Sequence, residues 1–371
     1  DLLQFITTGE ANTANGYQAL FNLTTGNRNT ASGGKALFNN TEGNGNTASG
    51  VNALFSNIGG NKNTASGTGA LYTNTTGNNN IASGFQALYT NTTGDNNTAS
   101  GYRSLFKNTT GNSNTASGNE ALYSNTTGRD NTASGVQALF TNITGNFNTA
   151  SGYQALANNT TGDQNTANGE SALYTNTTGY NNTAIGYFAD VTSSALTNAT
   201  AIGYSAQVND SNKVRLGNTL VTRIEGEVAF SASSDARLKE NITVVDAGLA
   251  LVNDLNPVSY HRINNSSDDI EMGLLAQEVE EVLAAHGLSN SGMVHQASED
   301  AYRSVRYNDL LAPMIKAIQE LDDASEAKDE QIASLQQRLE SQQEELLAIV
   351  QSQQEQIAQL QKLVEHQFAS N

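Results

Sequence analysis

Ser234 and Lys239, five residues apart, are side chains whose types could form a nucleophile and its base. A serine hydroxyl is a poor nucleophile until a neighbouring base takes its proton. A free lysine amine has a pKa of about 10.4 and is protonated at neutral pH, so it can accept that proton only if burial lowers its pKa. Serine and lysine at this spacing are common, and Lys239 could instead pair with Asp235 or Glu240 on a surface. The spacing alone leaves both interpretations open.

Other kinds of chemistry find little support in the composition. The chain has no cysteine, which excludes disulfides, thiol nucleophiles and cysteine-bound metals. Its histidines are scattered, so we expect no metal site and no cofactor, and His261 is only a weak candidate helper of the serine. Glycosidases need paired carboxylates, whereas acids in the repeats are sparse and isolated. The histidines are His261, His286, His295 and His366, and the isolated acids are Glu10, Glu42, Asp95, Glu120 and Asp163.

The charge distribution excludes further classes of partner. The net charge is −18, of which −3 falls in the first 231 residues and −15 in the rest. An acidic chain without a basic patch predicts no binding to nucleic acid or to anionic membranes. No apolar run approaches the about 20 residues of a membrane span, so we expect no membrane insertion.

A 17-residue repeat occupies the first part of the chain, with the consensus N-T-A-S-G-x-x-A-L-[FY]-x-N-T-T-G-[ND]-x. The motif Asn-Thr-Ala-Ser-Gly, altered to Ala-Ile-Gly in the last two coils, ends every 17 residues from Gly16 to Gly203. A second glycine recurs with the same period from Gly26 to Gly179. Because Gly9 falls one period before Gly26, the array begins in mid-repeat, and we expect the natural protein to be longer.

Seventeen residues are too few for a two-helix repeat but suit one coil of a β-solenoid, with two short strands and two turns. The glycines would supply positive φ at the turns. Asparagine-rich corners can bond their own backbone, and identical side chains can stack from coil to coil. Alternation along a strand places Thr30 and Ser32 on one face and Ala31 and Gly33 on the other.

The large apolar residues come in adjacent pairs, such as Leu20 with Phe21. Neighbours on a strand point opposite ways, so one of each pair can fill the coil interior while the other faces an outside partner. A row of nearly one aromatic per coil would be a long apolar stripe on a monomer. We therefore predict that the repeats form a homotrimer, in which two sister chains cover this row.

The last coils carry a resemblance that agrees with this prediction. The stretches Asn182-Thr-Ala-Ile-Gly-Tyr187 and Ala201-Ile-Gly-Tyr-Ser-Ala206, the latter followed by Lys213-Val-Arg-Leu-Gly217, resemble the head repeats of trimeric autotransporter adhesins. The resemblance implies parallel β-rolls in which three chains pack side by side.

Several roles remain open for such repeats. They could be a spacer, or they could contact a receptor through exposed Thr and Asn faces, and regular Thr/Ser ladders could bind ice. A calcium solenoid needs an Asp in most coils, but Asn usually fills the position that Asp95 and Asp163 share. The Asn-x-Thr sequons are explained by turn chemistry, with no secretory signal in view, and occur at Asn22, Asn91, Asn108, Asn125 and Asn142.

Three separated motifs after the repeats resemble the intramolecular chaperone of phage tailspikes and tail fibres, including endosialidases, also called peptidase S74. They are Ser234-Asp-x-Arg-Leu-Lys-x-Asn-Ile, Gly273-Leu-Leu-Ala-Gln-Glu-Val-Glu280 and Ser304-Val-Arg-Tyr-Asn-Asp-Leu-Leu311. Because the three occur in the family's order, the resemblance is specific, and it covers about residues 233–325.

The resemblance implies a self-cleaving serine peptidase that turns over once and has no external substrate. The family cuts before the motif serine, here between Ser233 and Ser234, with Ser234 as nucleophile and Lys239 as base. It also implies that the lysine is buried only in the assembled trimer, which would tie cutting to correct folding. Asp235, Arg237 and Asn241 are expected to orient the scissile loop.

The segment around these motifs has the pattern of a small α+β domain. We predict helices over 247–255 and 277–285, and strands over 258–263, 272–276 and 302–307. Short strands over 220–230 would form a neck before it. Asn308 can cap the following helix, which should kink or restart at Pro313.

The C-terminal segment from Pro313 reads as a long helix with a heptad seam and one inserted four-residue step. We predict a trimeric coiled coil that brings three chains into register, with Gln342 and Gln353 as polar layers. The alternative is a single amphipathic helix folded back on its own domain. The full seam is Ile332, Leu335, Leu339, Gln342, Leu346, Val350, Gln353, Ile357, Leu360 and Val364.

The sequence thus predicts a mainly β trimeric solenoid over 1–207, a β neck over 208–233, a chaperone and autoprotease domain over 234–312, and a helical coiled coil over 313–371. The favoured function is a phage tail fibre or tail-associated adhesin that contacts a glycan or protein receptor on a host cell. A bacterial surface fibre with the same chaperone, or a tailspike whose glycan-cleaving domain lies outside this chain, are the alternatives.

Overall fold

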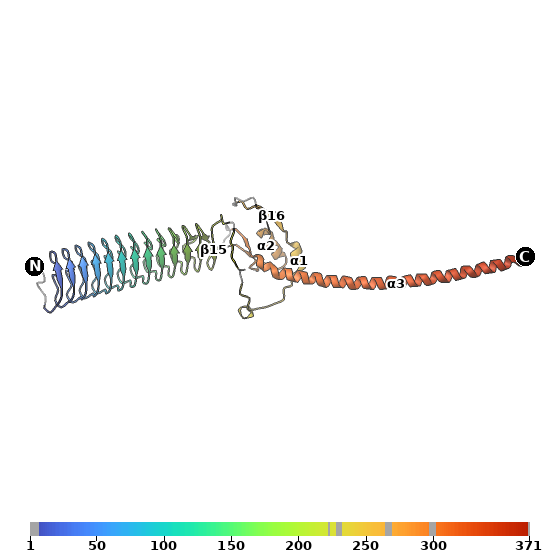
Figure 1. The fold of residues 1–371 in the computed structure, drawn as a ribbon, viewed down its shortest axis with the longest axis horizontal. Coiled ribbons are helices and arrows are strands. Elements are labelled where there is room, and N and C mark those ends of the chain that lie inside the picture. Colours follow the sequence, from blue (N-terminus) through green and yellow to red (C-terminus); the bar gives the residue numbers. More distant parts are fainter. Residues whose placement is uncertain (1–6, 222, 228–231, 264–268, 297–301, 370–371) are drawn as a thin grey trace. The chain divides into compact units, whose positions relative to one another are not determined.

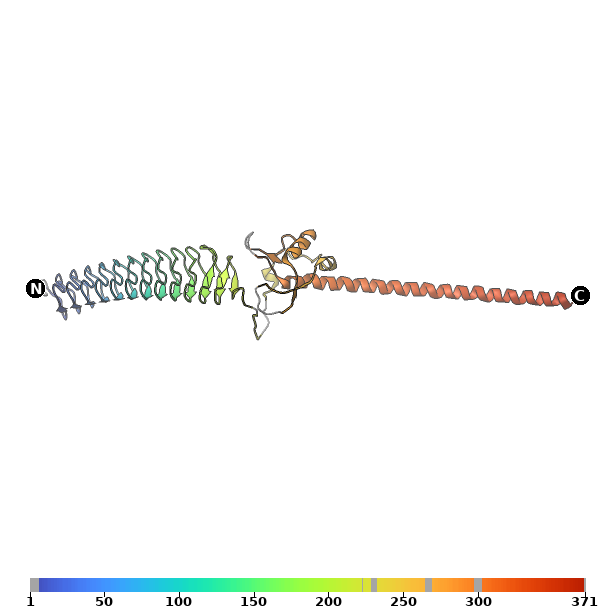
Figure 2. The ribbon, with the colours of Figure 1, turned by 90° about the horizontal axis from the view of Figure 1, so that it is seen from above.

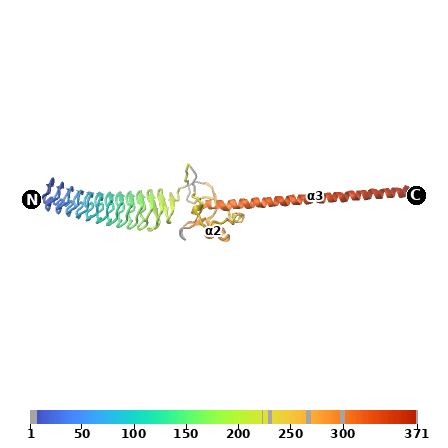
Figure 3. The ribbon, with the colours of Figure 1, turned by 90° about the horizontal axis from the view of Figure 1, so that it is seen from below.

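The computed structural model describes residues 7–221, 223–227, 232–263, 269–296 and 302–369. The chain divides into two compact units, Asp1–Glu225 and Gly226–Asn371. The first unit is a β-solenoid of about twelve coils, which Figures 1, 2 and 3 show from three sides as a regular stack.

One strand from each coil joins a parallel sheet of thirteen strands within the described residues. Neighbouring coils pair in register, so that Thr30 lies opposite Thr47 and Ala31 opposite Ala48. Near the end of the stack, β12 (Asp190–Val191) and β14 (Gln207–Val208) form a separate parallel pair. The strands of the large sheet are β1 (Thr13–Asn15), β2 (Thr30–Ser32), β3 (Thr47–Ser49), β4 (Thr64–Ser66), β5 (Ile81–Ser83), β6 (Thr98–Ser100), β7 (Thr115–Ser117), β8 (Thr132–Ser134), β9 (Thr149–Ser151), β10 (Thr166–Asn168), β11 (Thr183–Ile185), β13 (Thr200–Ile202) and β15 (Val214–Leu216).

The second strand that the sequence predicted for each coil is wrong for the regular coils. The chain there forms a turn in which two non-glycine residues, such as Gln86 and Leu88, have φ near 50°. A left-handed non-glycine residue costs roughly 1–2 kcal/mol. Burial of the leucine and a backbone bond from Leu88 N to the carbonyl of Ser104 in the next coil, 3.0 Å, offset that cost.

The two recurring glycines of each coil are required for different reasons. Gly101, at the end of the strand motif, has φ of 137°, as predicted for a turn glycine. Gly111 does not have a positive φ, which corrects the expectation for the second glycine. A Cβ there would collide with the backbone carbonyl of Gly128 in the next coil. The first glycine is needed for its backbone conformation and the second for space.

The interior of the solenoid is built from small and medium apolar side chains. Ala31 and Leu37 are completely buried, whereas Thr30 and Ser32 are exposed, which confirms the predicted alternation. The aromatics beside the leucines are half-buried from Phe21 to Phe140, and Tyr174 is exposed. Their rings stack from Phe21 to Phe140, with neighbouring ring centres 5.0–5.3 Å apart. Each ring is therefore partly covered by the next coil, and burial of this row by sister chains stays a prediction.

Two buried asparagine ladders run through the interior. Asn97 is fully buried and cannot hydrogen-bond to water. Its Nδ2 donates instead to the carbonyl of Gly111 at 2.8 Å. Asn108, also fully buried, donates to Asn91 Oδ1 at 2.7 Å and to the same Gly111 carbonyl at 2.9 Å. The predicted stacking of asparagines is confirmed. It also buries sequon residues such as Asn108, whose side chain is therefore not accessible for glycosylation.

The second unit is a small α+β domain followed by one long helix. Its antiparallel pairs are β16 with β17 and β18 with β19. The predicted helices and strands are confirmed, with shorter bounds for several. The elements are η1 (Ala236–Leu238), α1 (Leu249–Asp254), β16 (Val258–Tyr260), β17 (Glu271–Gly273), α2 (Ala276–Ala285), β18 (Val294–His295), β19 (Ser304–Val305), η2 (Tyr307–Leu310) and α3 (Leu311–Ala369).

Two details of the long helix differ from expectation. Asn308 does not cap α3, because it lies inside the 3-10 helix η2, whose N-cap is Arg306. Pro313 falls in the first turn of α3, where its missing N–H has no partner to lose. The expected kink is not present, and Figure 2 shows α3 as one unbroken helix. The alternative, a restart, falls two residues before Pro313, where α3 begins at Leu311 after η2. Of the stretch 220–230, the described residues 220, 221 and 223–227 form no strand.

We predict that Asn108→Ala destabilises the solenoid by about 2–4 kcal/mol, because the Oδ1 of Asn91 loses its buried donor and the Nδ2 of Asn125 loses one of its two acceptors. Thermal unfolding followed by circular dichroism measures this. Thr110→Ala, an exposed change in the same coil, is the control and should leave the transition nearly unchanged. Equal destabilisation by the two changes would contradict a role for the buried ladder.

Candidate functional site

A tight turn brings the candidate residues together. Asp235 is the N-cap of η1, and its carboxylate accepts the backbone N–H of Arg237 at 2.9 Å. The N–H groups of Leu238 and Lys239 donate to the carbonyls of Asp235 and Ala236, at 3.0 and 3.1 Å. An aspartate favours an N-cap because its side-chain oxygen satisfies an otherwise unpaired N–H. The turn places Lys239, at its end, beside Ser234, directly before its start.

Lys239 Nζ donates to Ser234 Oγ at 2.7 Å, which is the contact that a nucleophile and its base need. The structure thus brings together two residues that spacing alone could not pair. Lys239 makes no ion pair with Asp235 or Glu240 within the described ranges, so the surface-pair alternative is not what the structure has. Ser233, Ser234 and Lys239 are all exposed in the single chain.

The Asp235 carboxylate is held by Arg237 rather than by the lysine. Arg237 Nε and Nη2 bind both carboxylate oxygens, with Nη2 to Oδ2 at 2.6 Å. These hydrogen bonds hold the pKa of the Asp235 carboxyl below its usual range, and the carboxylate in turn raises the pKa of Arg237. Protonation of the Asp235 carboxylate would break its ion pair with Arg237. Because the carboxyl pKa is lowered, the ion pair is intact at neutral pH and is lost only as the pH falls through that lowered pKa.

Asn241 lies just beyond the turn with φ of 54°. Asparagine tolerates this left-handed conformation better than other non-glycine residues. The role of Asn241 in orienting the scissile loop stays a prediction, and its left-handed backbone is the feature of this residue that could serve that role.

The expected secondary candidates do not join this pair. No hydrogen bond links His261 to Ser234 or Lys239 among the described residues, and His286 binds Asp254 at 2.8 Å instead. In the described part of the chain, no three His, Asp or Glu side chains gather into a group that could hold a metal ion. Within the same ranges, no helix combines the length and the apolar character of a membrane span.

Comparison with known proteins supports the identity of this segment. Residues 234–288 match the family Peptidase_S74, described as the chaperone of endosialidase. The match begins at Ser234 and contains the second motif, Gly273–Glu280, whereas the third motif lies beyond it. No curated protein matches the chain. The chaperone match and the solenoid of 17-residue coils both fit a tail-fibre-type protein with a C-terminal chaperone.

The second and third motifs meet in the chaperone domain. The hydroxyl of Tyr307 accepts the backbone N–H of Leu274 at 2.9 Å, and Arg303, directly before the third motif, pairs with Glu280 at 2.9 Å. A Cβ on Gly273 would lie 2.5 Å from that hydroxyl, so the glycine keeps the space open. Sequence reasoning missed Tyr307 as a contact residue, although the fixed order of the motifs was a signal that they pack together.

Helix α3 is attached to the same domain at its base. Leu310, the last residue of η2 directly before α3, joins a core with Leu251, Val279 and Leu283. Glu320 accepts the backbone N–H of Leu249 at 2.7 Å and so fixes the start of α1 against α3. Sequence reasoning also missed Glu320, because its partner lies 71 residues away. The chaperone core and the long helix therefore form one packed unit at this point.

If the chain cuts itself before Ser234, as the family resemblance implies, we predict that Asn241→Gly preserves the cut, whereas Asn241→Val lowers the cut fraction about tenfold. Valine at a left-handed position costs roughly 1–2 kcal/mol and so depopulates the loop conformation. The cut fraction at a fixed time on a denaturing gel measures this. Full activity of the valine variant, or loss of activity in the glycine variant, would show that the backbone conformation of Asn241 does not matter.

Proposed function

We propose that this chain is part of a homotrimeric attachment fibre whose chaperone domain helps three chains to assemble and then cuts the Ser233–Ser234 bond. The observation that carries this proposal is the 2.7 Å contact between Lys239 Nζ and Ser234 Oγ, at the first residue of the chaperone match. A nucleophile on the residue directly after the scissile bond makes the reaction intramolecular, so its reactants are already held together.

The proposed reaction has two steps. The neutral Lys239 amine takes the Ser234 hydroxyl proton while Oγ attacks the carbonyl carbon of Ser233. The carbon–nitrogen bond then breaks, the lysine returns the proton to the Ser234 nitrogen, and an ester joins Ser233 to Ser234 Oγ. Water hydrolyses this ester, which leaves a carboxylate on Ser233 and a free amine on Ser234. No cofactor or external substrate takes part.

Exposure of the pair in the single chain supports coupling between cutting and assembly. A lysine amine in water holds its proton, whereas loss of that water favours the neutral form. Ser234 and Lys239 lie open to solvent in one chain. A neighbouring chain that covers the turn would supply the missing burial, so an unassembled chain would stay uncut.

The seam on α3 supports assembly into a coiled coil. Its apolar side chains are all exposed in the single chain, and they include Leu335, Leu339, Leu346 and Val350. Beyond its base the helix is exposed throughout its described side chains, so the alternative that it folds back on its own domain has no contact to support it. Three chains could bury this seam together, with Gln342 and Gln353 as polar layers that set register.

The fibre role extends from the chaperone to the solenoid. A tail-fibre-type protein of a phage virion would use the solenoid to reach or contact a receptor on its host. The same arrangement would serve a bacterial surface fibre, and identifying the neighbouring genes would separate these two. A glycan-cleaving domain outside this chain is the third reading, tested by release of sugar from host polysaccharide.

The native protein should run as two bands on a denaturing gel, and Ser234→Ala as one band of full length, because the variant lacks the nucleophile. Lys239→Arg keeps the positive charge but cannot act as a base, so it should also stay uncut. Mass spectrometry of the fragments locates the bond. Two bands from Ser234→Ala would sink the proposed reaction.

Replacing Leu346 and Val350 by serine should abolish the trimer and the cutting together, because both side chains belong to the seam. Leu347→Ser with Ala348→Ser is the control, since both residues are exposed on the same helix but lie off the seam. Sedimentation equilibrium and the gel assay give the two readouts. A trimer that survives the first pair, or is lost equally with the second, would refute the seam.

A further inference from the structure

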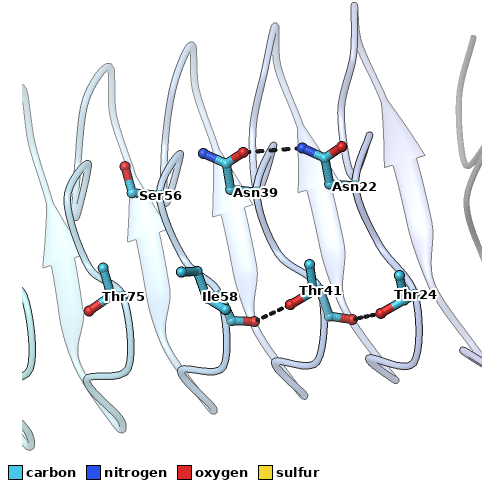
Figure 4. A pocket seen from close by; sticks show the side chains of 7 residues that line it. All are labelled: Asn22, Thr24, Asn39, Thr41, Ser56, Ile58 and Thr75. Carbon is cyan, nitrogen blue, oxygen red and sulfur yellow. Dashed lines mark hydrogen bonds between the residues drawn. The ribbon is translucent and has the colours of Figure 1, made fainter.

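A shallow groove of about 600 Å³ crosses four consecutive coils near the start of the solenoid. Figure 4 shows that its lining forms two rows, one from each of two positions in the repeat. The first row is Asn22, Asn39 and Ser56, and the second row is Thr24, Thr41, Ile58 and Thr75. The volume lies within the range of about 300–1,000 Å³ that small-molecule sites occupy.

The second row presents carbon to the groove. Thr24 Oγ1 donates to the carbonyl of Thr41 at 2.9 Å, and Thr75 Oγ1 donates to the carbonyl of Thr92 at 3.0 Å. Because these hydroxyls turn toward the backbone, the threonine methyl groups point toward the other row, as Figure 4 shows. Ile58 continues this apolar row and is half exposed.

The first row presents polar groups. Asn22 Nδ2 donates to Asn39 Oδ1 at 3.1 Å. Among the described residues, neither Asn39 Nδ2 nor Ser56 Oγ has a protein partner, so both can bond a ligand. None of the seven lining side chains is charged, which gives the groove no ion pair for phosphate or for an acidic sugar.

The position of the first row holds different residues along the solenoid. It is threonine in several coils, where the hydroxyls of Thr73, Thr90 and Thr141 donate to carbonyls of the next coil at 2.7–2.9 Å. Ser124 and Asn158 occupy it in two other coils. A threonine hydroxyl at this position donates its hydrogen bond to the backbone, so it offers no free donor to a ligand. The solenoid can therefore form at this position without any group that reaches outward, and Asn39 and Ser56 are not required by the fold.

We propose that this groove binds a short segment of a neutral, linear glycan, an inference that rests on the attachment role proposed above. A sugar ring has a carbon–hydrogen face that suits the methyl row and hydroxyls that suit an amide row, which can both donate and accept. A peptide strand is a poorer fit, because strand addition needs unpaired backbone groups. Here the carbonyls of Thr41 and Ile58 already accept hydrogen bonds from the preceding coil.

The test measures binding of cellotetraose, maltotetraose and chitotetraose to the full-length protein by saturation-transfer NMR. Oligosaccharide concentrations up to about 10 mM cover the range of weak single-site affinity. The test variant is Asn39→Thr with Ser56→Thr, which gives the groove the residue that this position has at Thr73, Thr90 and Thr141. The matched control is Asn158→Thr with Ser124→Thr, the same two changes at the same repeat position several coils away.

We expect at least one of the three oligosaccharides to bind, the groove variant to bind it about tenfold more weakly, and the control to bind it unchanged. Equal binding by the groove variant would overturn the site, as would a change of oligomeric state in that variant, which would make the groove an interface between copies. Adsorption of the fibre to host cells is measured in parallel. No binding of any probe by a fibre that still adsorbs overturns the glycan inference and leaves the attachment proposal standing, whereas loss of adsorption by the native fibre removes both.

Discussion

Pairing of buried asparagines between coils is the constraint on which the solenoid depends. Each of these amides is out of reach of water, and its donors and acceptors are satisfied by an asparagine of the adjacent coil and by a glycine carbonyl. A buried amide without a partner costs more than a paired one contributes. One coil on its own therefore cannot hold its interior, and the array is stable only as a stack, as in other repeat proteins.

The same constraint creates a problem of register in the proposed trimer. Within a chain, connectivity fixes which coil follows which. Between chains the coils are nearly alike, so a slip of one whole coil would preserve most side-by-side contacts. Long-range parallel pairing is also slow and exposes unpaired edges while it forms. A register device outside the repeats would remove this ambiguity, and the seam of α3, with its polar layers, is suited to that task.

At the turn after Ser234, the alignment of the Ser234–Lys239 pair and its proposed activation have different sources. A 3-10 turn capped by Asp235 is enough to place Lys239 on Ser234, because all of its contacts are local. It leaves both side chains exposed in the single chain. The local sequence thus supplies the alignment, while the proposed activation requires a surface that one chain does not have.

The sequence determined the period of the solenoid, the alternation of Thr30 and Ser32 outside with Ala31 inside, the stacked asparagines, the chaperone motifs and the long helix, because each is written in spacing or in a local pattern. It also indicated the pair Ser234 and Lys239 through resemblance. Only the tertiary structure decided that the regular coils have one strand and a turn of left-handed leucines, since that conformation is stabilised by the next coil rather than by its own residues. The contacts of Glu320 with α1 and of Tyr307 with Leu274 were likewise out of reach, because they join residues far apart in the chain whose approach depends on the packed core.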